Sequence, residues 1–170
     1  MFTALEKCPD LVIVSPDYSL YVEASRHFVE MLRQFSPNVE QYSIDEAWVD
    51  MTGTQRLFGT PRIAAEKMRE RIFQELGFTV NIGISTNKLL AKMASDFEKP
   101  DKVHTLWKSE IEKKMWPLPV SELFMVGKSS LPKLRSLGIH TIGDLAQMNP
   151  EILEAHLKSF GKLIWQNANG

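Results

Sequence analysis

Two adjacent carboxylates, Asp45 and Glu46, stand between two short stretches that are rich in β-forming residues. Neighbouring side chains of a flat strand point to opposite faces, so these two can converge only if the backbone turns there. Residues 39–43 and 47–51 are therefore predicted to be the strands of a hairpin, and residues 52–54 end the second strand.

Such a pair of carboxylates could hold a divalent cation. Two like charges about 4 Å apart repel by about 4 kcal/mol at an effective dielectric constant of about 20, so convergence requires a cation or a shared proton. Magnesium binds through one or two carboxylates together with substrate phosphates, and the sequence has no Cys/His cluster for zinc. Asp45 and Glu46 are thus candidate catalytic Mg²⁺ ligands. The alternative is a solvated acidic turn.

The pattern of apolar residues and helix caps predicts the elements that would position this hairpin. A buried strand is expected at 11–14, and further strands are expected at 78–84 and 103–106. Helices are expected to begin at Pro16-Asp17, to run from 60 to 76 with Gly77 at the end, and to include Lys88 and Lys92. Helices packed on one face of a mostly antiparallel sheet would make residues 1–106 an α+β domain.

From residue 107 onward the pattern is helical, with breaks at proline and glycine. Helices are predicted at 130–137, from Thr141, after Asn149-Pro150, and after Ser159-Phe160-Gly161. The chain is therefore expected to divide near residues 106–108 into the α+β domain and a small helical domain at 107–170.

The composition is that of a globular protein, with 44% hydrophobic and 24% charged residues. No apolar run approaches the length of a membrane span or signal peptide, and Cys8 alone provides no disulfide framework. These features predict a cytoplasmic protein without a membrane partner. The net charge of -1 means that any nucleic-acid surface must come from the local arrangement of basic residues.

The segments 43–50, 81–100 and 137–145 follow one another along the chain. In this order they resemble the palm hairpin, the palm strand and helix, and the second half of the thumb helix-hairpin-helix of the Y-family, or lesion-bypass, DNA polymerases. The resemblance implies a partial palm at 1–106 and a thumb at 107–170. It also implies an internal fragment, because the family's further palm strand with another metal-ligand Asp, its fingers and its little finger have no counterpart here.

The family's activity is template-directed nucleotidyl transfer from deoxynucleoside triphosphates to a primer 3′-hydroxyl during DNA damage bypass. The resemblance implies two Mg²⁺ ions held partly by Asp45 and Glu46, and primer-template DNA as a partner. A sliding clamp would bind through regions outside this chain, and the fragment alone is expected to be inactive. Lys99 matches the position that reaches the nucleotide triphosphate. Lys88 and Lys92 share a helix face that suits DNA backbone contact.

The thumb turn supplies further candidate contacts with DNA phosphates, namely Gly127, Lys128, Ser129 and Ser130. Met125 stands where family members commonly have the first glycine of a Gly-x-Gly turn, and this departure slightly favours the polymerase V-like branch over the polymerase IV-like branch. Trp48 is expected to pack in the core, and Asp50 to have a supporting role.

Two other functions remain open. The chain could be a noncatalytic, polymerase-like scaffold of a mutagenesis complex. Such a scaffold would be expected to have lost its acidic ligands, so the intact Asp45 and Glu46 argue against this function. It could also be a helix-hairpin-helix DNA-binding module on an unrelated α/β domain, which would leave the palm motifs unexplained.

Overall fold

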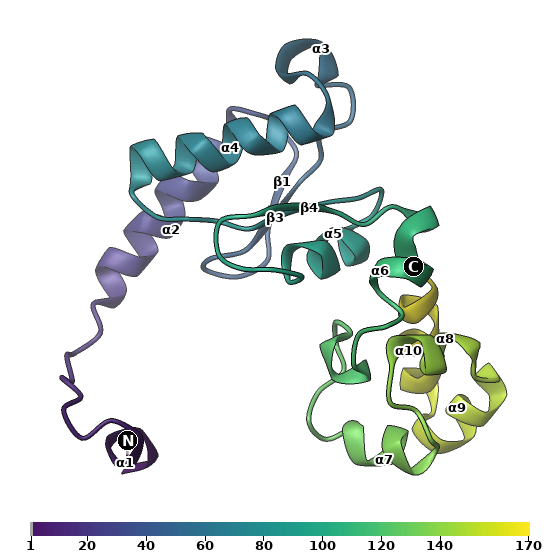
Figure 1. Cartoon of the computed structure of the whole chain (residues 1–170). Helices are drawn as coiled ribbons and strands as arrows, with labels where there is room; N and C mark the ends of the chain where they lie inside the picture. The colour runs from purple at the N-terminus through teal and green to yellow at the C-terminus, as the bar shows by residue number, and fades with distance from the viewer. Residues whose placement is uncertain (1) are drawn as a thin grey trace.

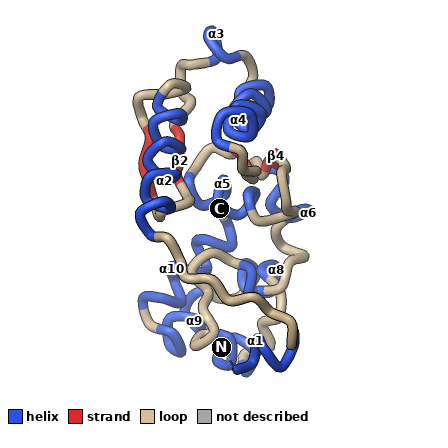
Figure 2. The backbone as a smooth tube through the Cα atoms, turned by 90° about the vertical axis from the view of Figure 1, so that its left-hand side faces the viewer, coloured by secondary structure: helices blue, strands red, loops and turns tan. Residues whose placement is uncertain are grey.

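Two hydrophobic cores organise the chain. The computed structural model describes residues 2–170 (Figure 1). The first core lies between α2 (Tyr18–Arg33), α4 (Pro61–Leu76) and the strands. The second lies among the short helices of the C-terminal part, most of which lie below the strands in the view of Figure 2. None of the described helices is long and apolar enough to cross a membrane.

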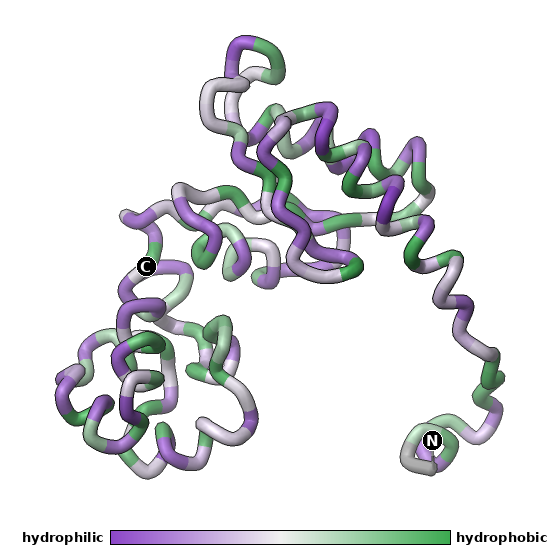
Figure 3. Tube along the Cα trace, turned by 180° about the vertical axis from the view of Figure 1, so that it is seen from behind, coloured by the Kyte–Doolittle hydropathy of each residue, from purple (hydrophilic) through white to green (hydrophobic). Residues whose placement is uncertain are grey.

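The N-terminal arm consists of α1 (Phe2–Lys7) and the extended residues that lead into α2 (Figure 3). Asp17 caps α2 by accepting a hydrogen bond from the Leu20 backbone N–H at 3.1 Å, as predicted. The predicted buried strand at 11–14 is wrong, because Val12 and Val14 are 83% and 78% exposed. A strand needs a neighbouring strand for its backbone groups, and no described segment pairs with this one.

The predicted hairpin is confirmed, although its strands are shorter than expected. Strands β1 (Val39–Gln41) and β2 (Ala47–Val49) pair antiparallel, with Glu40 opposite Trp48. The turn between them is closed by the backbone carbonyl of Glu46, which accepts hydrogen bonds from the N–H groups of Tyr42 and Ser43. The turn therefore projects Asp45 and Glu46 at one end of the hairpin.

The second pair of strands corrects one detail of the predicted α+β fold. Strands β3 (Ile82–Ile84) and β4 (Val103–Thr105) pair in parallel, so the described residues form two two-stranded sheets and not one mostly antiparallel sheet. A parallel pair needs a crossover, and α5 (Lys88–Ser95) supplies it. Gly83 packs against α5, whereas its neighbour Ile82 joins the core under α4. Helices therefore cover both faces of this pair, not one.

Caps position the helices of this part, and those of α4 were predicted from sequence. Thr60 caps α4 and Gly77 ends it with φ of 76°, while α3 (Gln55–Phe58) was not predicted. The Asn87 side chain accepts a hydrogen bond from the Leu90 N–H at 2.8 Å and begins α5. The helix therefore starts at Lys88, directly after its N-cap.

The C-terminal part is helical, as predicted. Its elements are η1 (Lys108–Glu110), α6 (Ile111–Lys114), η2 (Val120–Glu122), α7 (Leu131–Ser136), α8 (Ile142–Gln147), α9 (Pro150–Leu157) and α10 (Ser159–Asn169). Helix α5 contributes Leu90, Met93 and Ala94 to the core of this part. The crossover helix of the β3–β4 pair thus also anchors the helical part, and a contact between Asn87 and the Gly170 carbonyl joins the same regions.

Asp144→Ala is expected to destabilise the chain by about 1 kcal/mol at neutral pH, because Asp144 completes the capping box of α8. Its carboxylate accepts hydrogen bonds from the backbone N–H groups of Thr141 and His140, and these bonds lower the pKa of Asp144 below 3.8. Because the folded-state pKa is lowered, this stabilisation is present above pH 3.8 and is lost as the pH falls through the folded-state value.

Urea unfolding of the chain at neutral pH and below pH 3.8 would check this expectation. The exposed Glu154, replaced by alanine, is the control and should change stability by no more than about 0.5 kcal/mol. A difference between wild type and Asp144→Ala that stays constant across the acid range would contradict the role of the carboxylate charge.

Candidate functional site

The two carboxylates of the hairpin turn are joined by one hydroxyl. Ser43 Oγ lies 2.8 Å from Asp45 Oδ1 and 3.3 Å from Glu46 Oε2. Asp45 is exposed and the side chain of Glu46 is 37% exposed, so both carboxylates remain accessible to a ligand. The turn itself is tied to α2, because Gln41 Nε2 donates hydrogen bonds to Ser25 Oγ and to the Ser43 carbonyl, each at 3.0 Å.

The cation that this acidic turn requires is provided in the structure by Lys92. Its ammonium lies 2.8 Å from Glu46 Oε1 and 2.7 Å from Asp96 Oδ2, and its side chain is only 18% exposed. Burial disfavours the charged form of Lys92, but the hydrogen bonds with Asp96 and Glu46 outweigh it and raise the pKa of Lys92 above its usual value. Lys92 therefore stays protonated at neutral pH and screens Glu46.

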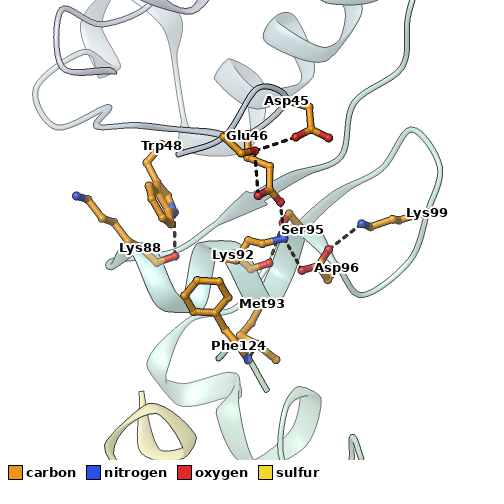
Figure 4. A network of polar contacts seen from close by, with 11 residues as sticks. Asp45, Glu46, Trp48, Lys88, Lys92, Met93, Ser95, Asp96, Lys99 and Phe124 are labelled. Atoms are coloured by element: carbon orange, nitrogen blue, oxygen red, sulfur yellow. Dashed lines mark hydrogen bonds and ion pairs between the residues drawn. The ribbon is translucent and has the colours of Figure 1, made fainter. Parts of the chain in front are cut away.

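Lys99, the predicted nucleotide contact, belongs to the same network. Its ammonium lies 2.7 Å from Asp96 Oδ1, and its side chain is 58% exposed. Burial opposes the charge of Asp96, yet the hydrogen bonds from Lys92 and Lys99 dominate and lower the pKa of Asp96. The charges of Glu46, Lys92, Asp96 and Lys99 thus alternate in sign from the hairpin to the residue before Pro100 (Figure 4).

Lys88 faces the same hairpin one turn earlier on α5. It forms an ion pair with Glu40, and its ammonium lies 5.4 Å from the centre of the Trp48 ring. Trp48 is half-buried and not part of either buried core; its Nε1 donates a 3.1 Å hydrogen bond to the Lys88 carbonyl. Lys88 and Lys92 share one face of α5, as expected, but in the structure both form ion pairs with carboxylates. Their contact with DNA stays a prediction.

The donor set of the turn suits a magnesium ion only in part. No group of three or more Asp, Glu, His or Cys residues is assembled for a metal within residues 2–170. Asp45 and Glu46 offer oxygen donors, and Mg²⁺ commonly takes one or two carboxylates and completes its shell with water and substrate phosphates. Asp50 does not join the pair, because its carboxylate accepts a 2.9 Å hydrogen bond from the Thr52 N–H. The residues present therefore fit a site that substrate completes.

Sequence reasoning missed Ser43 and Asp96 as site residues. Ser43 lies inside the recognised motif, and a serine two residues before an aspartate in a turn is a signal for a side-chain hydrogen bond. Asp96 stands four residues after Lys92, a spacing at which charges meet on a helix, and three residues before Lys99, which lies beyond the end of α5. The spacing alone could have linked Asp96 with Lys92. The contact between Lys92 and Glu46 needed the tertiary structure.

The thumb turn lies just before α7. Gly127, Lys128 and Ser129 are exposed, Ser130 is half-buried, and the Ser130 N–H donates a 3.0 Å hydrogen bond to the Gly127 carbonyl. The preceding Phe124 holds this turn near the hairpin, because its N–H lies 3.3 Å from Met93 Sδ and its ring lies 6.0 Å from the Tyr42 ring. The thumb residues are thus accessible, and their contact with DNA stays a prediction.

Met125→Gly is expected to raise stability by about 0.5 to 1 kcal/mol. Met125 has φ of 75° and is 55% exposed, so its side chain adds left-handed strain and little packing. Such strain costs about 1 to 2 kcal/mol, and glycine would relieve it. The greater freedom of glycine in the unfolded chain would in turn lower stability by about 0.5 to 1 kcal/mol. Thermal unfolding would measure the difference. Lys128→Gly, at a residue without positive φ, is the control and should lower stability.

The sequence profile described as the impB/mucB/samB family matches residues 1–96, and the profile described as the IMS family HHH motif matches residues 108–139. The chain belongs to the impB/mucB/samB family. These matches confirm the resemblance to the Y-family polymerases. The second match also confirms the helix-hairpin-helix in the helical part.

Curated members of the impB/mucB/samB family share sequence along the chain. DNA polymerase IV of Clostridium acetobutylicum is 51% identical over 170 residues, which are 100% of this chain and 43% of that protein. DNA polymerase IV 2 of Bacillus subtilis is 40% identical over 173 residues, 100% of this chain and 42% of that protein. The chain therefore spans less than half the length of these relatives. Both are named polymerase IV, so they do not support the polymerase V-like branch.

Solved structures with the same fold cover almost the whole chain. The crystal structure of DinB from Sulfolobus solfataricus matches with a TM-score of 0.85 and 24% identity, over 99% of this chain and 50% of that one. An insertion ternary complex of Dbh DNA polymerase matches with a TM-score of 0.85 and 25% identity, over 98% of this chain and 49% of that one. The mixed helix and strand fold predicted for the chain is thereby confirmed.

Proposed function

We propose that this chain is the palm and thumb part of a translesion DNA polymerase, with the palm at residues 1–106 and the thumb at 107–170. The full-length protein would transfer nucleotides from deoxynucleoside triphosphates to a primer 3′-hydroxyl under the direction of a template. The observation that carries the proposal is the Asp45–Glu46 turn, which faces α5. Lys92 of this helix contacts Glu46 and Asp96, and Asp96 in turn contacts Lys99. The family membership supports the same activity.

In this reaction Asp45 and Glu46 would hold Mg²⁺, which when bound supplies positive charge that neutralises phosphate oxygens and favours ionisation of the primer hydroxyl. The Ser43 hydroxyl orients both carboxylates from one side. Lys99 places an ammonium where it would bind the triphosphate and offset the charge that develops on the leaving pyrophosphate. These residues together would bind and align the nucleotide.

Primer-template DNA would lie along the basic residues of α5 and the thumb turn. Lys88 and Lys92 would contact its backbone after exchange of their carboxylate partners, and Gly127, Lys128, Ser129 and Ser130 would bind phosphates from the thumb. A sliding clamp would bind regions of the full-length protein outside this chain. A polymerase of this kind would act in the cytoplasm, where bacterial DNA lies.

Primer extension by the full-length protein tests the proposal. Reactions would contain undamaged or abasic template, with all four deoxynucleoside triphosphates and with Mg²⁺ present or removed by chelation. We expect magnesium-dependent extension whose products follow the template, with synthesis past the abasic site. DNA binding without extension would favour the scaffold function. Metal-independent DNA binding that does not require a primer end would favour the helix-hairpin-helix module.

A further inference from the structure

Asp96 occupies an unusual position for a carboxylate. It is the C-cap residue of α5, where the negative end of the helix dipole disfavours an anionic side chain. Helix stability therefore does not account for an aspartate at this position. Two lysines compensate for its charge, Lys92 on Oδ2 and Lys99 on Oδ1, each at 2.7 Å.

Asp96 is the carboxylate that connects the acidic turn with the predicted phosphate-binding lysine. Within residues 2–170, the ion pairs of Lys99 involve Asp96 alone, and those of Lys92 involve Asp96 and Glu46. Without Asp96, the ammonium of Lys99 would move on an exposed four-carbon side chain. Lys92 would have Glu46 as its remaining carboxylate partner in this part of the chain.

The geometry leaves both lysines able to bind further groups. An ammonium has three N–H donors, so Lys99 can donate to Asp96 and to phosphate oxygens at the same time. Lys92 likewise donates to two carboxylates at once, those of Glu46 and Asp96. An anchored ammonium loses less conformational freedom when a phosphate binds, which favours binding.

We propose that Asp96 is a positioning residue that acts through Lys99, with Lys92 as its second partner, and holds the Lys99 ammonium where the nucleotide triphosphate binds. This inference rests on the proposed function, because it requires a nucleotide at Lys99. It assigns Asp96 no contact with the substrate. Its effect should therefore appear in nucleotide affinity and should depend on the presence of Lys99.

The test uses the full-length protein with the Asp96→Asn change and measures two quantities. One is the Kd of the correct deoxynucleoside triphosphate on a dideoxy-terminated primer-template, where no chemistry occurs; the other is the KM and kcat of single-nucleotide insertion. We expect Kd and KM to rise about tenfold, with a smaller change in kcat. Asp96→Glu keeps the charge and should restore most of the nucleotide affinity.

Glu98→Gln is the matched control, because Glu98 is a 65% exposed carboxylate on the same segment whose partner is Lys102 at 3.8 Å. It should leave Kd, KM and kcat within about twofold of wild type. Lys99→Ala alone should raise Kd, and adding Asp96→Asn to it should change Kd by less than about twofold if Asp96 acts through Lys99.

Independent, multiplying effects of Asp96→Asn and Lys99→Ala on Kd would overturn the inference. So would a lower melting temperature and kcat with unchanged nucleotide Kd, which would indicate a purely structural role. A wild-type protein that does not extend primers would contradict the proposed function. A wild-type protein that extends primers, with an Asp96→Asn variant that binds nucleotide as Glu98→Gln does, would contradict this inference alone.

Discussion

Asp45→Asn and Glu46→Gln are each expected to lower primer extension by the full-length protein by at least about 10³-fold. Each change keeps the size of the side chain and removes the charge that would balance a divalent cation, and metal stabilisation of a phosphoryl-transfer transition state is worth several kcal/mol. The loss should appear in kcat, because the carboxylates would align the reacting groups. DNA affinity should remain, since the thumb turn and α5 lysines are unchanged.

Asp50→Asn is the matched control for these variants. Asp50 follows β2 in the same hairpin, but its carboxylate bonds to the Thr52 N–H and not to the network of Glu46 and Lys92. Insertion kinetics for this variant should stay within about threefold of wild type. Full magnesium-dependent activity in either Asp45→Asn or Glu46→Gln would contradict the assignment of the turn as the metal site.

Gly83→Ala is expected to destabilise the chain by about 3 kcal/mol or more, a large part of the marginal stability of a domain. A Cβ atom at Gly83 would lie 1.8 Å from the Ala91 carbonyl oxygen and 2.5 Å from the Ser95 backbone nitrogen. Both atoms belong to the backbone of α5, so the helix itself must move. The same movement would displace Lys92 from Glu46, because α5 carries that lysine.

Urea unfolding followed by circular dichroism would measure the effect of Gly83→Ala. Gly127→Ala is the control, since nothing lies within 4 Å of a Cβ atom there and its φ is not in the left-handed region. It should change stability by no more than about 0.5 kcal/mol. Equal stability of the two variants would mean that α5 does not pack closely on β3.

Local signals in the sequence determined much of the fold. Asp17 and Thr60 begin helices and Gly77 ends one because caps and glycine act through backbone groups only a few residues away. The hairpin around Asp45 and Glu46 was predictable for the same reason, because two β-forming stretches flanked a short polar turn. The candidate metal ligands were therefore identified from residues that are neighbours in the chain.

The tertiary structure alone decided the pairing of β3 with β4 and the partners of Lys92. Residues 11–14 have the composition of a strand, but pairing depends on a second segment whose position the local pattern does not encode. The contact of Lys92 with Glu46 joins residues 46 positions apart, and Gly83 allows α5, which carries Lys92, to pack closely on β3. The sequence by itself determined the elements and the acidic turn, whereas close packing between distant segments determined which charges meet.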